Sequence, residues 1–271
     1  MAHRHSHHAG SMLMLDSLAA HSGLRDVSPG LKTAFSVLVL LLCVSASDAL
    51  VGIFVVLSMV LIMGFLGKTS VDHIAELLMI PLLFLLVSCL VILLEILREP
   101  VGLWQLRLGN HWLCVTTGSL HRAVTLFFQA MGAVSCLYFL STSTPLPQLI
   151  EVLRRVHVPD LVIELMYLIY RYLFVLLETQ RQMTVAAEAR LGYAGLRRSV
   201  STAGRVSGAL LAASFRRSSQ CFDAMESRGY NGRLLFLTRT PPLRLCHLLS
   251  AIAYLLALFG LIVLRKGGFS L

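Results

Sequence analysis

Long apolar runs separated by short polar connections dominate the pattern along the chain. A helix needs about 20 apolar residues to cross a hydrocarbon core about 30 Å thick. Five runs approach that length, over approximately residues 31–47, 49–66, 74–97, 119–141 and 245–264. We predict a transmembrane helix over each. Residues 31–141 would hold four of them, and residues 245–271 the fifth helix with the C-terminus.

The polar breaks between these runs predict how the helices are joined. Asp48 separates the first two runs and favours a tight helical hairpin. Pro81 predicts a kink in the third. We expect a loop over residues 102–118, where Trp104 and Trp112 are typical of a membrane boundary.

Residues 142–244 show a different pattern, in which apolar residues recur at helical spacing between charges. A short amphipathic helix is expected over 145–156, ended by Pro159. A long one is expected over 161–190, with Asp160 as its N-cap. Glu164, Arg171 and Glu178 are spaced by seven and predict a narrow wet stripe. A weaker amphipathic helix is expected over 205–228, after a connection at 195–204.

Arginine concentrates in this region, which carries 14 Arg and 7 acidic residues and no Lys. A sixth span over 161–177 would export the 11 arginines that follow it, against the positive-inside rule, and would place Glu164 and Arg171 in the bilayer. We therefore predict that residues 142–244 lie on the cytoplasmic membrane face, as does the N-terminal tail, residues 1–30.

Composition agrees with an all-α integral membrane protein of about five transmembrane helices, with a cytoplasmic amphipathic region between the fourth and fifth. Of 271 residues, 56% are hydrophobic and 14% charged, which excludes a soluble surface. The net charge of +9 is expected to mark cytoplasmic loops rather than a nucleic-acid site. No cleavable signal peptide is recognisable.

Candidate metal and catalytic residues are few. The six cysteines lack CxxC spacing and are interpreted as small apolar residues. The N-terminal cluster His3, His5, His7 and His8 fits either a divalent-ion site or an unstructured tail. The glycines Gly64 and Gly67 are too close for a phosphate loop. Apart from that tail we expect no metal or catalytic site in this chain.

The most informative feature is a repeated helix ending. Residues 186–193 (AAEARLGY) and 224–230 (AMESRGY) share Glu, a small residue, Arg and then Gly-Tyr, with Arg190 and Arg228 38 positions apart. Either copy alone is a common helix ending, in which Arg faces the carbonyl end and Gly follows. Two copies predict docking to a duplicated partner, such as a symmetric pair of ATPases, whose carboxylates would accept the guanidinium groups. The predicted docking residues are Ala189, Arg190, Gly192, Ser227, Arg228 and Gly229.

With these residues the sequence resembles the transmembrane (T) component of energy-coupling-factor transporters, specifically the cobalt-type CbiQ family. The resemblance runs from about Ser28 to the C-terminus and is carried by residues 28–32 (SPGLK), 142–145 (TSTP) and the two helix endings. The sequence departs from the family at three positions. It has Gly30 where the family often has Arg, and Ser227 where the family favours Ala. It also has Leu191 inserted before Gly192.

This resemblance implies a subunit that binds no cofactor and hydrolyses no ATP. Two ABC ATPase subunits, which hold ATP and Mg, would dock on the two helix endings in the bacterial inner membrane. A substrate-binding membrane subunit would contact an apolar helix face. The transported ion would be a transition-metal ion, cobalt in the first place, with nickel as the alternative. That face comprises Leu161, Leu165, Leu168, Tyr172 and Val175.

Two alternative functions would each require residues of a different kind. A self-contained secondary transporter or channel for a small ion would need ionisable groups deep in the spans, and almost none occur there. A membrane enzyme would need paired acids or a His/Glu cluster at one face. Asp72, His73 and Glu76 are better explained as the start of a helix.

Overall fold

The computed structural model describes residues 23, 27–67, 71–97, 104–108, 111–232, 241–242 and 244–267. These form two compact units, which are described separately. The first, called the membrane unit, covers residues 15–145 and 240–271. The second, called the arginine-rich unit, covers the described residues 146–232.

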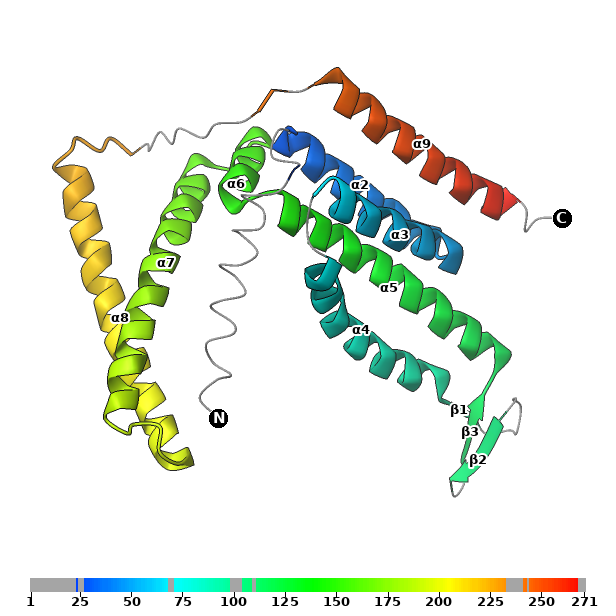
Figure 1. The fold of residues 1–271 in the computed structure, drawn as a ribbon, viewed down its shortest axis with the longest axis horizontal. Helices are drawn as coiled ribbons and strands as arrows, with labels where there is room; N and C mark the ends of the chain where they lie inside the picture. Colours follow the sequence, from blue (N-terminus) through cyan, green and yellow to red (C-terminus); the bar gives the residue numbers. More distant parts are fainter. Residues whose placement is uncertain are drawn as a thin grey trace. The chain divides into compact units, whose positions relative to one another are not determined.

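The membrane unit contains the five predicted apolar helices, drawn in Figure 1. They are α2 (Pro29–Ala46), α3 (Ala49–Phe65), α4 (Val71–Leu93), α5 (Thr117–Ser143) and α9 (Leu245–Gly267). Four are long and apolar enough to cross a membrane, over Pro29–Ala46, His73–Leu93, Thr117–Ser143 and Leu245–Arg265. α3 has 17 residues, at the short limit for a span. The protein is therefore a multi-pass, all-α membrane protein, as predicted.

Helix α5 packs against α2, α3 and α4, and glycine allows the closest of these approaches. A Cβ on Gly52 of α3 would lie 2.6 Å from the carbonyl carbon and oxygen of Phe128. A Cβ on Gly132 of α5 would lie 2.7 Å from the sulfur of Cys43 on α2. Membrane helices associate through small residues because hydrocarbon exclusion does not drive them together.

Polar side chains of α2 also bind backbone oxygens of α5. The Lys32 ammonium donates to the Ser143 carbonyl at 2.8 Å and is only 2% exposed. One turn further, the Ser36 hydroxyl donates to the Cys136 carbonyl at 2.8 Å. The Lys32 charge therefore lies at the carbonyl end of α5, where a helix dipole favours a cation. The start of α2 and the end of α5 are thus on one side of the membrane unit.

A small antiparallel sheet follows α4, which corrects the predicted loop over 102–118. Strands β1 (Glu95–Leu97) and β2 (Trp104–Leu108) both pair with β3 (His111–Val115), in the order β1-β3-β2. Leu108 pairs with His111, so only two residues, Gly109 and Asn110, join β2 to β3. The third apolar run consequently ends as a helix at Leu93 rather than at residue 97, because residues 95–97 pair as a strand.

The arginine-rich unit consists of α6 (Leu146–Arg155), α7 (Asp160–Ala189) and α8 (Leu196–Glu226). Helices α6 and α7 enclose a small core of Ile150, Ile163 and Tyr167. The Tyr167 hydroxyl donates to the Pro147 carbonyl at 3.2 Å. Helix α7 is not among the helices apolar enough to span, within the part of the chain described.

Two predicted boundaries in this unit are wrong. Pro159, not Asp160, is the N-cap of α7, and Asp160 lies in the first turn, where its charge suits the helix dipole. Helix α8 begins at Leu196, nine residues before the predicted 205, so most of the expected connection at 195–204 is helical. Residues 195–204 are rich in Ser and Arg, which is typical of a connection, but the Ser199 hydroxyl donates to the Tyr193 and Gly195 carbonyls in the first turn of the helix.

Candidate functional site

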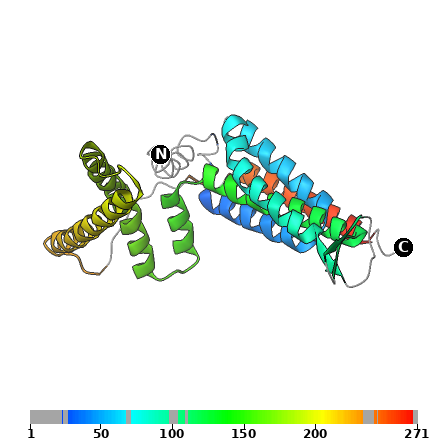
Figure 2. The same ribbon diagram turned by 90° about the horizontal axis from the view of Figure 1, so that it is seen from below.

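Helices α7 and α8 form an antiparallel pair, visible in Figures 1 and 2. Six residues, 190–195, join the end of α7 to the start of α8. At the other end of the pair, the Tyr230 hydroxyl, just after α8, donates to the Glu164 carboxylate near the start of α7 at 2.9 Å. The ending that bears Arg190 and the ending that bears Arg228 therefore lie at opposite ends of the pair. They are separated by the length of α8, about 45 Å for some 30 residues.

The first helix ending is a Schellman motif, the usual closure of a helix by a left-handed residue. The Gly192 N–H donates to the Ala187 carbonyl at 2.9 Å, and the Leu191 N–H donates to the Glu188 carbonyl at 2.9 Å. The left-handed residue is Leu191, with φ of 56°.

The second helix ending has the same hydrogen bonds 38 positions later. The Tyr230 N–H donates to the Met225 carbonyl at 3.1 Å, and the Gly229 N–H donates to the Glu226 carbonyl at 2.9 Å. Here the left-handed residue is Gly229, with φ of 78°. Arg190 and Arg228 occupy the same position, directly before the left-handed residue.

This equivalence changes how the two copies align. In the sequence Gly192 aligns with Gly229, but by backbone conformation Leu191 is the residue equivalent to Gly229. Glycine is needed at position 192 for lack of space, because a Cβ there would lie 2.9 Å from the Ala187 carbonyl oxygen and 3.0 Å from the Thr202 hydroxyl. That hydroxyl donates to the Gly192 carbonyl at 2.8 Å and fixes the connection to α8. The inserted Leu191 therefore leaves the backbone of the first ending intact.

Both arginines are exposed and available to a partner. Neither Arg190 nor Arg228 forms an ion pair or hydrogen bond with another side chain of the described residues. Ala189 and Ser227, directly before them, are also exposed, as is Gly229, whereas Gly192 is half-buried. The structure thus places all six predicted docking residues at two exposed or half-exposed helix ends.

The predicted apolar face of α7 is only partly free. Leu161 and Leu165 are exposed, whereas Leu168, Tyr172 and Val175 are half-buried. The Tyr172 hydroxyl interacts with Cys221 of α8, and this hydrogen bond raises the pKa of Tyr172. The second half of the face therefore takes part in packing α7 against α8, and its role toward another subunit stays a prediction.

Glu164 does not belong to a wetted stripe, contrary to the prediction. Its side chain is only 5% exposed, while Arg171 and Glu178 one and two heptads later are exposed. The Tyr230 hydroxyl satisfies the buried carboxylate, and the pKa of Tyr230 is raised mainly by this hydrogen bond. Local sequence patterns do not reveal this pairing, because the two residues are 66 positions apart.

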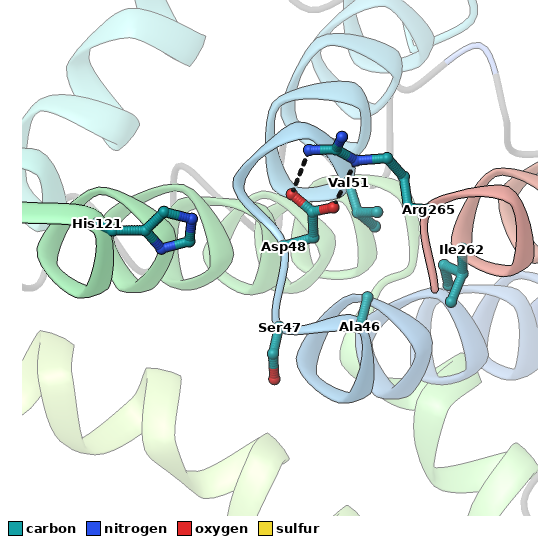
Figure 3. Close-up of a pocket in the computed structure, with 7 residues that line it drawn as sticks. All are labelled: Ala46, Ser47, Asp48, Val51, His121, Ile262 and Arg265. Atoms are coloured by element: carbon teal, nitrogen blue, oxygen red, sulfur yellow. Dashed lines mark hydrogen bonds and ion pairs between the residues drawn. The ribbon is translucent and has the colours of Figure 1, made fainter. Parts of the chain in front are cut away.

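A pocket of about 300 Å³ lies in the membrane unit (Figure 3). Asp48, between α2 and α3, and His121 of α5 line it together with Arg265 of α9. The Arg265 guanidinium binds Asp48 at 2.7 Å and holds the pKa of that carboxyl below its ordinary value. A guanidinium on the only carboxylate of the pocket disfavours a cation there, so we assign the pair to packing α9 beside the α2–α3 turn.

Within the described ranges, no three His, Cys, Asp or Glu side chains are grouped closely enough to hold an ion. The cluster of His3, His5, His7 and His8 lies outside the described residues.

Comparison with known proteins gives consistent matches. Residues 20–238 match the family model CbiQ, described as cobalt transport protein. The chain is 30% identical over 202 residues to the cobalt transport protein CbiQ of Rhodobacter capsulatus, covering 73% of this chain and 78% of that protein. It is 31% identical over 154 residues to that of Salmonella typhimurium, covering 56% and 68%. The putative fused cobalt transport protein CbiMQ of Methanocorpusculum labreanum is 26% identical over 249 residues, which are 92% of this chain but 42% of the fused protein.

Proposed function

The chain belongs to the CbiQ family of cobalt transport proteins, and we propose that it is the transmembrane coupling subunit of an ATP-driven energy-coupling-factor importer. In this role it links two ABC ATPase subunits to a substrate-binding membrane subunit. The transported substrate is a transition-metal ion, cobalt in the first place. The single observation that carries the proposal is the pair of helix endings with one backbone geometry and two unpaired, exposed arginines.

Two equivalent endings suit two equivalent partners. Each presents a guanidinium beside a small residue, Ala189 or Ser227, so that the helix tip enters a groove without steric hindrance. A carboxylate in the groove accepts the guanidinium in a bidentate pair, which fixes direction as well as distance. Because α7 and α8 are antiparallel, the endings are far enough apart for each ATPase subunit to hold one of them.

A mechanical role follows from this arrangement. When ATP binding and hydrolysis close and open the ATPase pair, the two bound endings move with it. The Tyr230–Glu164 hydrogen bond and the Thr202–Gly192 hydrogen bond tie α7 and α8 together at both ends, which supports transmission of the movement through the pair. ATP and Mg belong to the ATPase subunits, and this chain performs no catalysis.

The proposed orientation places the arginine-rich unit in the cytoplasm and the protein in the bacterial inner membrane. Five crossings from an inner N-terminus put Asp48 and Arg265 outside, on one side, which agrees with their ion pair. They put the start of α2 and the end of α5 inside, which agrees with the Lys32–Ser143 hydrogen bond. Arg265, which would otherwise oppose the positive-inside rule, has its charge balanced by Asp48.

The exposed part of the α7 face, Leu161 and Leu165, is the proposed contact for the substrate-binding membrane subunit. The fused relative CbiMQ joins a CbiQ part to a further part in one chain, which supports a partner beside this protein. Selection of the metal ion belongs to that partner, and the lipid bilayer completes the environment of this subunit.

Mutation of both arginines tests the proposal. Arg190→Ala with Arg228→Ala should leave the protein in the membrane but release the ATPase subunits on co-purification and abolish ATP-dependent cobalt uptake. Each single variant should retain one attachment and lose most uptake, since coupling requires both.

A matched control is available on the same helix. Arg205→Ala with Arg216→Ala removes two exposed arginines of α8 that lie away from both endings, and should retain binding and uptake. If the Arg190/Arg228 double variant binds the ATPases and transports like the wild type, the proposal is wrong. Equal losses in the control would assign the effect to total charge rather than to the endings.

A further inference from the structure

We propose that Leu191 is an apolar anchor that inserts into the ATPase subunit bound at the first helix ending, and that the second ending has no such anchor. This inference rests on the proposed function and concerns one residue that the docking of arginines does not explain. The site it predicts on the partner is a small apolar pocket bordered by carboxylates.

The backbone conformation of Leu191 is the first observation. A left-handed residue at a helix end is ordinarily Gly, because a Cβ in this region approaches the following carbonyl oxygen. Leu191 adopts it with φ of 56°, while Gly229 occupies the equivalent place at the second ending. Glycine would thus close the first ending with less strain, and the leucine side chain needs another explanation. Residues held in such regions often have a functional role.

The surroundings of the side chain exclude a packing role within the arginine-rich unit. Leu191 is 70% exposed, so its apolar surface remains largely in water. A leucine that contributed to the core of this unit would be buried. The backbone bond of Leu191 to Glu188 does not depend on the side chain either.

The chemistry of the neighbours identifies the partner. Arg190 precedes Leu191, and Arg197 and Arg198 follow in the first turn of α8, all three exposed. The only acidic residue between 186 and 200 is Glu188. An apolar side chain within a basic ending is complementary to an apolar pocket with an acidic rim. Since Arg190 and Leu191 are adjacent, the subunit that pairs with the guanidinium is the one that receives the leucine.

The second ending lacks this contact because Gly229 has no side chain. There is room for one, since a Cβ on Gly229 would have no neighbour within 4 Å. The two endings therefore share the arginine contact but differ in apolar contact. The ATPase subunit at the first ending is held more firmly than the one at the second.

Three substitutions at one position separate the apolar contact from the backbone conformation. Leu191→Gly and Leu191→Asn both favour the left-handed conformation and remove the apolar side chain. Leu191→Met retains an apolar side chain of similar volume. The measurement is the dissociation constant of the full-length chain in nanodiscs for the ATPase subunits that co-purify with the wild type, together with the thermal unfolding midpoint.

Leu191→Gly and Leu191→Asn should weaken binding about tenfold or more, the effect of losing one buried leucine. Their unfolding midpoints should be equal to or above the wild-type value, and Leu191→Met should bind like the wild type. Wild-type affinity in the Gly and Asn variants would overturn the anchor. Weaker binding accompanied by a lower unfolding midpoint in both would also overturn it, by assigning Leu191 a structural role.

The arginine double variant, measured in the same assay, distinguishes the two proposals. If Arg190→Ala with Arg228→Ala loses the ATPases while the Leu191 variants bind normally, only the anchor is refuted. If the arginine variant binds normally, the proposed function itself fails.

Discussion

Leu191 and Gly229 occupy the same backbone position at the ends of two successive helices, 38 residues apart in the sequence. Each follows an exposed arginine, and each donates its N–H to the carbonyl of a glutamate three residues earlier. The repeat seen in the sequence is thus a structural repeat. Its register, however, follows the left-handed residue rather than the glycine.

The two glycines of the repeat should respond differently to substitution. The Cβ added by Gly229→Ala would meet no neighbouring atom. This substitution should lower the free energy of unfolding by about 1 kcal/mol, because alanine adopts the left-handed conformation less readily than glycine. Gly192→Ala would place a Cβ 2.9 Å from the Ala187 carbonyl oxygen, which belongs to the backbone and cannot move freely. Thermal unfolding in detergent should therefore show a larger decrease for Gly192→Ala. Equal decreases would contradict the assigned register.

Tyr230→Phe should loosen the contact between the end of α8 and the start of α7. The substitution removes the hydroxyl that donates to the buried Glu164 carboxylate, and a buried carboxylate with fewer donors is unfavourable. Hydrogen exchange should increase in residues 222–230 and 160–166 and stay unchanged around Gly192 at the other end. Unchanged exchange in the first two segments would show that the bond does not hold the helices together.

The same bond predicts a response to alkaline pH. The folded-state pKa of Tyr230 is raised above its ordinary value of about 10. The hydrogen bond therefore contributes its full stabilisation of the fold at pH values below about 10. It is lost as the pH rises through the raised pKa. The difference between wild type and Tyr230→Phe in hydrogen exchange should therefore disappear at sufficiently high pH, and a difference that persisted there would need another cause.

Asp48→Asn isolates the ion pair with Arg265, since Asn retains the ability to cap α3. Arg265 lowers the pKa of Asp48, so the pair stabilises the fold above the ordinary pKa of about 4 and is lost as the pH falls through the lowered value. The unfolding midpoint of the variant should be slightly lower than that of the wild type at pH 7, and equal to it in strong acid. Arg265→Gln should give the same pH profile. A pH-independent difference would argue against the ion pair.

Hydropathy predicted the helices of this protein well, because the bilayer requires long apolar runs and little else. The five apolar helices and the long α7 lie close to their predicted positions. The sheet was missed because pairing between β1 and β3 joins residues separated by a β-strand and two connections, which local pattern does not reveal. Short strands after an apolar helix are easily read as part of that helix or as a loop.

Local sequence located the two helix endings, but not their geometry, and the docking role of their residues stays a prediction. Local sequence identified Arg190 and Arg228, since a helix ending is a local structure. It could not show that Leu191 rather than Gly192 takes the left-handed conformation, as leucine rarely does so. The burial of Glu164 and of Lys32 also escaped prediction, because each depends on a partner more than 60 residues away.

Photo-crosslinking from the two helix endings tests the central claim most directly. A photoreactive residue in place of Ala189 or Ser227 lies directly before each arginine and leaves both guanidinium groups in place. In the intact complex in native membranes, both positions should crosslink to a nucleotide-binding subunit. The same residue at exposed Ser45, which the proposed topology places near the opposite membrane side, should not. Crosslinks to the ATPase from neither ending, or from Ser45 instead, would contradict the account.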